Sequence, residues 1–89
     1  MFYYVYLLES KKNGELYVGF TEDLAKRFKE HNQGLNFSTK SAKPWQIIYY
    51  EASLNEKDAR RREEYLKTTQ GKRLLKRRLK EYHYSKNLI

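Results

Sequence analysis

Glu63 stands out because it places a charged side chain at a helix position that should face the core. On the helix predicted to follow residue 55, Ala59 and Leu66 lie four residues before and three residues after Glu63, so the three share one stripe. Burying an unpaired carboxylate is costly, so Glu63 needs a partner. That partner is a cation, an arginine or a metal ion, and the purely structural alternative is a salt bridge to Arg27 or Arg60. Mg²⁺ commonly takes only one or two protein carboxylates and fills its shell with waters and phosphate oxygens, so one glutamate suffices.

Arg27 and His31 form a second candidate pair. They are four residues apart on a predicted helix and are therefore neighbours on one face. An arginine donates two hydrogen bonds to a phosphate and keeps its charge at any working pH. Cleavage of a phosphodiester needs such a donor where negative charge grows in the transition state. The ordinary alternatives, a solvated arginine and a structural histidine, stay open at this point.

A predicted hairpin sets the position of several tyrosines. Residues 2–9 are almost continuously apolar, as is typical of a strand covered on both faces. Asn13-Gly14 predicts a turn into a second strand over residues 15–20. A tight two-residue turn would place four side chains on one face: Tyr4, Tyr6, Leu8 and Tyr17. A one-residue slip of register would separate Tyr6 from Tyr17.

The helix that carries Arg27 and His31 should follow this hairpin directly. Thr21 predicts its N-cap, and Glu22 and Asp23 place negative charge in its first turn. We expect it to run to about Asn32 and to end before Gly34.

The remaining segments predict one strand and two helices. Residues 35–44 have the composition of a loop, and residues 45–50 read as a third strand. Either Ser53 with Glu56 or Asn55 with Asp58 offers a capping box for a helix to about Thr68. Thr69-Gln70-Gly71 should break that helix, and a last helix should run from about residue 72 to 82. The whole predicts one domain over residues 1–89, an α+β fold with a three-stranded antiparallel sheet flanked by helices.

Charge is concentrated in the last third of the chain. Residues 1–56 hold seven basic and seven acidic groups, whereas residues 57–89 hold twelve basic and four acidic groups, so the net charge of +8 lies entirely in this part. Six of these basic residues are candidates for nucleic-acid binding: Arg60, Arg61, Arg73, Lys76, Arg77 and Lys80. A one-sided basic field favours a polyanionic partner, with nucleic acid first, although a solvated surface is the plain alternative.

The other compositional features exclude some classes of protein. Cysteine is absent, which rules out disulfides and thiolate metal sites and suits a cytoplasmic location. The apolar N-terminal segment is far shorter than the roughly 20 residues of a membrane span, so no membrane association is expected.

Taken in order, these motifs resemble the GIY-YIG nuclease family, in the branch of small standalone domains related to the N-terminal nuclease module of the bacterial excinuclease C subunit. The first motif corresponds to Tyr4-Val5-Tyr6 and the second to Tyr17-Val18-Gly19. The functional positions of the family fall on five residues: Tyr6, Tyr17, Arg27, His31 and Glu63. Phe20 stands where excinuclease-type members have a lysine, and the last helix has no clear counterpart of the asparagine that some members carry.

The resemblance implies a DNA endonuclease that depends on Mg²⁺ or Mn²⁺, or a nuclease-like domain in DNA repair or processing. Glu63 would bind the metal, Arg27 would clamp the scissile phosphate, and Tyr17, helped by Tyr6 and His31, would handle the proton of the attacking water. Because a phenol with an ordinary pKa of about 10 is a poor base at neutral pH, the metal or Arg27 must favour the phenolate.

Two other functions remain open. One is a catalytically silent nucleic-acid-binding module on the same fold, and the other is an RNA-binding, for instance ribosome-associated, protein. A passive binder has no need of all five family residues, which favours the enzyme. DNA is expected ahead of RNA, and nothing in one isolated domain reads sequence, so specificity could come from a protein partner.

Overall fold

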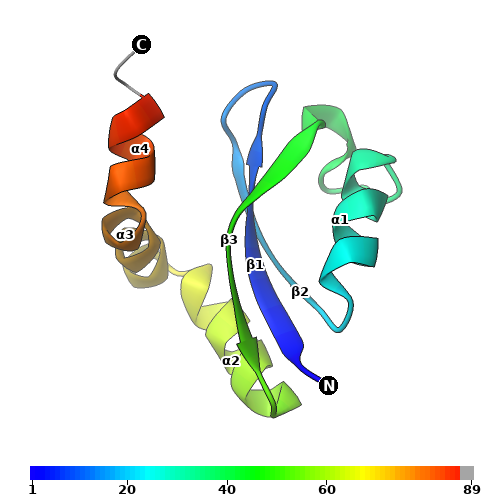
Figure 1. The fold of residues 1–89 in the computed structure, drawn as a ribbon, viewed down its shortest axis with the longest axis vertical. Coiled ribbons are helices and arrows are strands. Elements are labelled where there is room, and N and C mark those ends of the chain that lie inside the picture. The colour runs from blue at the N-terminus through cyan, green and yellow to red at the C-terminus, as the bar shows by residue number, and fades with distance from the viewer. Residues whose placement is uncertain (87–89) are drawn as a thin grey trace.

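The computed structural model describes residues 1–86, and it is built on a three-stranded antiparallel sheet with strand order β2-β1-β3. Its elements are β1 (Tyr3–Ser10), β2 (Leu16–Thr21), α1 (Leu24–Asn32), a short 3-10 helix (Lys40–Ala42), β3 (Trp45–Ser53), α2 (Glu56–Leu66), α3 (Thr69–Arg78) and α4 (Lys80–Lys86). Helix α1 covers one face of the sheet, and α2, α3 and α4 lie on the other (Figure 1). The predicted fold class is therefore confirmed.

The central strand β1 is buried on both faces, as its apolar run predicts. One face packs against α2 and α3 through Val5 and Leu7, which join Ala59, Leu66 and Leu75 in a buried cluster. The other face packs toward α1 and the following loop through Tyr6 and Leu8, which join Ala42 and Trp45. The alternation along β1 thus sends Tyr6 toward α1 and its neighbours Val5 and Leu7 toward α2.

The β1–β2 hairpin has a longer loop than the tight turn considered from the sequence. Ser10 N–H donates to the Glu15 carbonyl at 2.8 Å, which leaves residues 11–14 as a four-residue loop. The register places Leu8 opposite Tyr17 and Tyr6 opposite Gly19. This is a shift of two residues, so it preserves the parity: Tyr6 and Tyr17 share a face, as predicted.

Helix α1 begins two residues later than predicted. Its N-cap is Asp23, whose side chain accepts from Lys26 N–H, while Thr21 is the last residue of β2. Thr21 is the wrong cap because its hydroxyl accepts from Asp23 N–H instead, in a turn that joins strand to helix. Glu22 and Asp23 therefore precede the first helical turn. The predicted end before Gly34 is confirmed, since Gln33 is the C-cap.

Asn55, the second of the two predicted caps, is the N-cap of α2: its side chain accepts from Lys57 N–H at 2.8 Å.

The predicted break at residues 69–71 is misplaced, because Thr68 caps a new helix that begins at Thr69. Gly71 lies in the first turn of α3, where a Cβ would come within 2.8 Å of the Tyr65 carbonyl carbon. Here glycine lets α3 pack closely onto the end of α2.

The predicted last helix is divided into α3 and α4 at Leu79. Helix α4 is fastened to the sheet through Glu9, a buried carboxylate on β1 that accepts from the Tyr82 hydroxyl and pairs with Lys86. These partners lower the pKa of Glu9 in spite of its burial. No helix within residues 1–86 has the length and apolar character needed to cross a membrane.

Candidate active site

Tyr6 is the buried centre of the site. Its side chain is 1% exposed, and its hydroxyl lies 2.7 Å from His31 Nε2. Burial raises the pKa of this phenol to about 12, and the charges of Tyr17 and Glu63 act in the same direction, whereas Arg27 opposes them. At neutral pH the Tyr6 hydroxyl is therefore protonated and donates to His31.

Gly19 makes room for the Tyr6 ring on the neighbouring strand. The two residues are directly opposite each other, and a Cβ on Gly19 would lie 2.8 Å from Tyr6 Cε2 and closer still to Cζ and the hydroxyl. The glycine of the second motif is thus required by packing: only a residue without a side chain leaves space for the tyrosine of the first motif.

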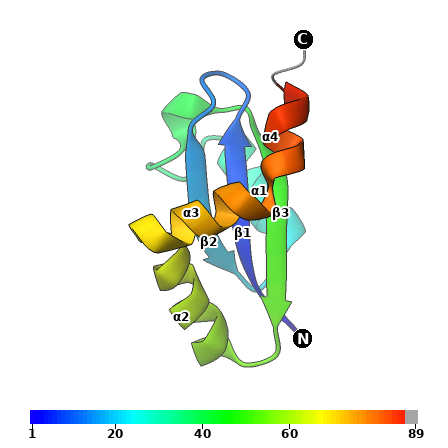
Figure 2. The same ribbon diagram turned by 90° about the vertical axis from the view of Figure 1, so that its left-hand side faces the viewer.

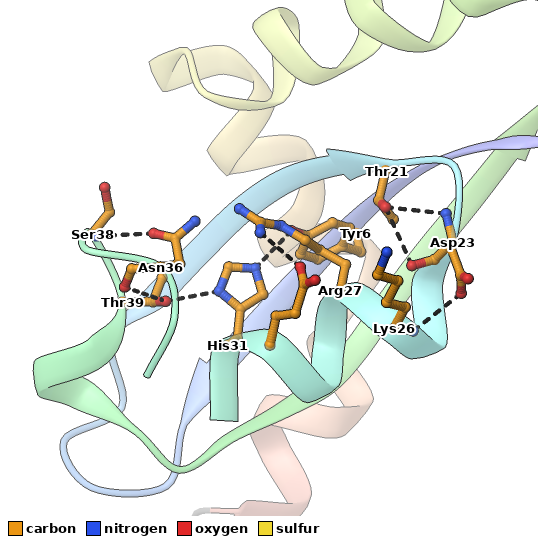
Figure 3. A network of polar contacts seen from close by, with 10 residues as sticks. Tyr6, Thr21, Asp23, Lys26, Arg27, His31, Asn36, Ser38 and Thr39 are labelled. Atoms are coloured by element: carbon orange, nitrogen blue, oxygen red, sulfur yellow. Dashed lines mark hydrogen bonds and ion pairs between the residues drawn. The ribbon is translucent and has the colours of Figure 1, made fainter. Parts of the chain in front are cut away.

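His31 connects Tyr6 to the loop before β3. It is fully buried, and its Nδ1 lies 2.7 Å from Thr39 Oγ1 (Figure 3). Burial, followed by the charge of Arg27, lowers the pKa of His31 to about 4, so the imidazole is neutral at neutral pH. With Tyr6 donating to Nε2, Nδ1 carries the proton and donates to Thr39, which fixes one tautomer.

Arg27 lies one helical turn before His31 and stays partly open to solvent. Its Nη1 lies 3.0 Å from Glu30 Oε1, and its side chain is 32% exposed. Although partial burial opposes the charged form, Glu30 and Tyr6 raise the pKa of Arg27. The guanidinium is held in place by one carboxylate and retains donors that can bind an incoming anion.

Tyr17 stands on the edge strand β2 next to His31. The two ring centroids are 5.2 Å apart in an edge-on arrangement, and the Tyr17 side chain is half-buried. It therefore contacts the buried pair Tyr6 and His31 on one side and is accessible on the other.

Glu63 reaches the same cluster from α2, which contacts β1 and β2 from the opposite face of the sheet. Its carboxylate is near enough to help raise the pKa of Tyr6. The side chain is only 18% exposed, between the fully buried Ala59 and Leu66, as the helix stripe predicts. Its partner is Lys67, at 3.1 Å, so an ion pair with Arg27 or Arg60 is the wrong expectation.

The five predicted residues thus come together, but with two kinds of exposure. Tyr6 and His31 are buried, whereas Tyr17, Arg27 and Glu63 keep accessible surface. The latter three are open to solvent, and the buried pair contacts Tyr17 through the His31 ring.

The donor set at Glu63 suits a hard divalent cation that keeps most of its own waters. Within residues 1–86, no three side chains of His, Cys, Asp or Glu form a cluster that would enclose a metal. A single, mostly buried carboxylate with a remaining open side fits Mg²⁺ or Mn²⁺, which complete their shells with waters and phosphate oxygens. Lys67 neutralises this carboxylate in the protein alone and is exposed enough to move away.

Arg60 provides a positive charge beside Phe20. The guanidinium lies 4.0 Å from the centroid of the Phe20 ring, and Arg60 Nε is 2.9 Å from Glu56 Oε2. Phe20 occupies the position where excinuclease-type members have a lysine. A cation held on its ring restores a positive charge to this place, one helical turn before Glu63.

The other basic candidates are not part of the cluster. All six are exposed, but Arg60 and Arg61 belong to α2, and Arg73, Lys76, Arg77 and Lys80 follow on α3 and α4, on the side of the sheet opposite α1.

Three contributors were missed from the sequence. Glu30 and Lys67 lie three residues after Arg27 and four after Glu63, spacings from which helical ion pairs can be predicted. Thr39 carries no such signal, because it is a single threonine in a predicted loop. Its hydroxyl bonds to His31, and its backbone carbonyl accepts a hydrogen bond from the Trp45 indole.

Comparison with known proteins gives a consistent result. Residues 2–76 match the family model described as the GIY-YIG catalytic domain. A UPF0213 protein of Clostridium perfringens is 34% identical over 90 residues, covering 96% of each chain. The structure-specific endonuclease subunit SLX1 homolog of Drosophila ananassae is 41% identical over 56 residues, covering 53% of this chain but 19% of that protein. The solution NMR structure of a UPF0213 protein from Bacillus halodurans has a TM-score of 0.53 and 32% identity, covering 84% of this chain and 82% of that one.

Proposed function

The chain belongs to the GIY-YIG catalytic domain family, and on that premise we propose that it is a divalent-metal-dependent DNA endonuclease that acts in DNA repair or processing. The observation that carries this proposal is the exposure pattern of the site. Accessible Tyr17 contacts the buried Tyr6–His31 pair, and the charges of accessible Arg27 and Glu63 act on the same Tyr6 hydroxyl, an arrangement that suits catalysis at a surface phosphate better than passive binding.

Each accessible residue has one role in hydrolysis. Arg27 donates to a non-bridging oxygen of the scissile phosphate and neutralises the charge that grows there. Tyr17, as its phenolate, orients the attacking water and accepts its proton as the new P–O bond forms and the bond to the leaving oxygen breaks. The leaving oxygen takes its proton from solvent. Glu63 would hold Mg²⁺ or Mn²⁺, which polarises the phosphoryl group and stabilises the leaving oxygen when bound.

Tyr6 and His31 are positioning residues in this mechanism. The chain of hydrogen bonds from Tyr6 through His31 to Thr39 fixes the imidazole against which the Tyr17 ring rests. Because the pKa of His31 is about 4, it adds no positive charge at neutral pH that would compete with Arg27 for the phosphate.

Nucleic acid beyond the cleaved bond would contact the exposed basic side chains of α2, α3 and the start of α4. These residues are Arg60, Arg61, Arg73, Lys76, Arg77 and Lys80. Such contacts carry no sequence information. Specificity is supplied by the shape of the substrate or by a protein partner, and the SLX1 relatives are themselves named as subunits.

The test is cleavage of supercoiled plasmid DNA by Glu63→Gln, with Glu64→Gln as the matched control. Glu64 is the exposed neighbour on α2, so both variants lose one carboxylate from the same helix. We expect nicking that requires Mg²⁺ or Mn²⁺ and is stopped by EDTA in the wild type and in Glu64→Gln, and its loss in Glu63→Gln. DNA binding and the unfolding midpoint of Glu63→Gln should stay close to those of the wild type. Equal nicking by both variants would assign the activity to another site.

A binding module without turnover is the second candidate, and one observation favours it. Lys67 occupies the carboxylate of Glu63 and would compete with a metal ion. If the protein is only a binding module, Lys67→Ala should bind Mg²⁺ or Mn²⁺ more tightly than the wild type but still not nick DNA. If it is an enzyme, Lys67→Ala should nick DNA as the wild type does.

A further inference from the structure

A groove on the sheet face opposite α1 is not used by the proposed mechanism. It has a volume of about 620 Å³, within the roughly 300–1,000 Å³ typical of ligand sites. Helix α3 crosses the sheet at this place (Figure 2). Five of its ten lining residues are aliphatic: Leu7, Leu16, Val18, Leu75 and Leu79. Leu16 is 53% exposed, so part of this apolar floor is open to solvent.

The rim of the groove is positively charged. Lys67, Lys72 and Lys76 line it, and none of the described residues that line it is acidic. Lys72 and Lys76 belong to α3 and are exposed. An apolar floor with a basic rim matches a ligand that has flat apolar groups along an anionic backbone.

The groove is continuous with the candidate active site. Tyr17 belongs to both, and Lys67 lines the groove while its ammonium lies 3.1 Å from Glu63. A nucleic-acid strand that leaves the site past Glu63 would therefore meet Lys67 first and then the groove.

We propose that this groove binds unpaired nucleotides adjacent to the cleaved phosphodiester, an inference that rests on the proposed nuclease function. The bases lie on the aliphatic floor and the phosphates pair with Lys67, Lys72 and Lys76. An intact duplex cannot use this floor because its bases are stacked inside, so only its phosphates would reach the lysines. The substrate class is DNA with a single-stranded segment beside the scissile bond.

The test uses the full chain carrying Glu63→Gln, in EDTA, so that binding is measured without cleavage. Fluorescence anisotropy compares a labelled ten-nucleotide dT strand with a blunt duplex of ten base pairs. Leu16→Gln removes apolar floor without changing charge, and Leu54→Gln, at a leucine 70% exposed outside the groove, is its matched control.

We expect Leu16→Gln to weaken binding of the dT strand on the order of fivefold and binding of the duplex less than twofold. Leu54→Gln should change neither. Lys72→Gln should weaken binding of the strand and lower the slope of its log affinity against log salt by about 0.7, as expected for one single-strand phosphate contact.

Equal losses for strand and duplex would overturn the proposal, since phosphate attraction alone would then explain binding. Unchanged binding of the strand by Leu16→Gln would also overturn it and leave the groove to a second copy of the chain or an acidic peptide. Failure of the proposed function is a separate outcome. In that case Glu63→Gln and the wild type would nick DNA equally, while Leu16→Gln would still weaken binding of the strand more than binding of the duplex.

Discussion

Replacing Gly19 with alanine tests whether the packing of two opposite residues assembles the site. A Cβ at this position would overlap the ring of Tyr6, with Cε2 at 2.8 Å and Cζ and the hydroxyl nearer. Tyr6 is 1% exposed, so its ring is enclosed by its neighbours. The ring must therefore shift, and its hydroxyl must move away from His31 Nε2.

The cost follows from three contributions. Overpacking a core costs about 1–3 kcal/mol. Leaving a buried hydrogen-bonding group unsatisfied costs about 1–3 kcal/mol. Alanine in place of glycine within a strand returns about 0.5–1 kcal/mol. The net loss of unfolding free energy should therefore be about 1–5.5 kcal/mol, against a total stability of only about 5–15 kcal/mol for a typical protein.

Urea unfolding followed by the fluorescence of Trp45 measures this loss. Trp45 is the single tryptophan, is 3% exposed, and lies in the same buried cluster as Tyr6. In a Tyr6→Leu background the overlap disappears, so Gly19→Ala should then be neutral or slightly stabilising. In a Tyr6→Phe background the ring carbons remain but the hydroxyl and its hydrogen bond to His31 are absent, so only the overpacking part of the cost should persist.

Two results would contradict this packing requirement at Gly19. The first is Gly19→Ala within 0.5 kcal/mol of the wild type, on the order of the error of such comparisons. The second is the same cost in the Tyr6→Leu and wild-type backgrounds, which would mean that the strand backbone, and not the tyrosine, requires glycine.

Two further predictions concern pH and salt. Because the pKa of His31 is lowered from 6.5 to about 4 in the folded protein, the unfolded chain takes up a proton first as pH falls, and stability should decrease by roughly 2–3 kcal/mol between pH 7 and 4.5. Urea unfolding of His31→Gln at pH 7 and at pH 4.5 should show a smaller decrease in stability than the wild type. A decrease equal to that of the wild type would mean that other groups cause it. Mutating Arg73 and Arg77 to Ala should lower the slope of log affinity against log salt by about two for duplex DNA, if each contacts one phosphate. An unchanged slope, measured by anisotropy against the exposed control Lys57→Ala, would show that this helix face is only solvated.

The sequence predicts those features of the site that depend on periodicity. The period of two along the hairpin places Tyr6 and Tyr17 on one face whatever the exact loop length, provided its parity is kept. The period of a helix places Arg27 beside His31 and Glu63 in the stripe of Ala59 and Leu66. These relations need no knowledge of the rest of the fold.

Features that depend on tertiary packing could not be predicted in the same way. The burial of Tyr6 and His31 arises because the loop before β3 closes over them through Thr39. The start of α3 at Thr69 depends on the close approach of Gly71 to the end of α2, which makes the glycine compatible with a helix. Local propensity at these positions is weak, and contacts distant in sequence decide the outcome.

The fastening of α4 to Glu9 also has a consequence for the order of events during synthesis. Tyr82 and Lys86 are 73 and 77 residues away from Glu9 along the chain. While the ribosome makes the intervening residues, the Glu9 carboxylate lacks both partners. Burying it without them is unfavourable, so it should remain in contact with water until Tyr82 and Lys86 are available. The end of β1 that carries Glu9 should therefore be completed last, although β1 is the first strand to emerge.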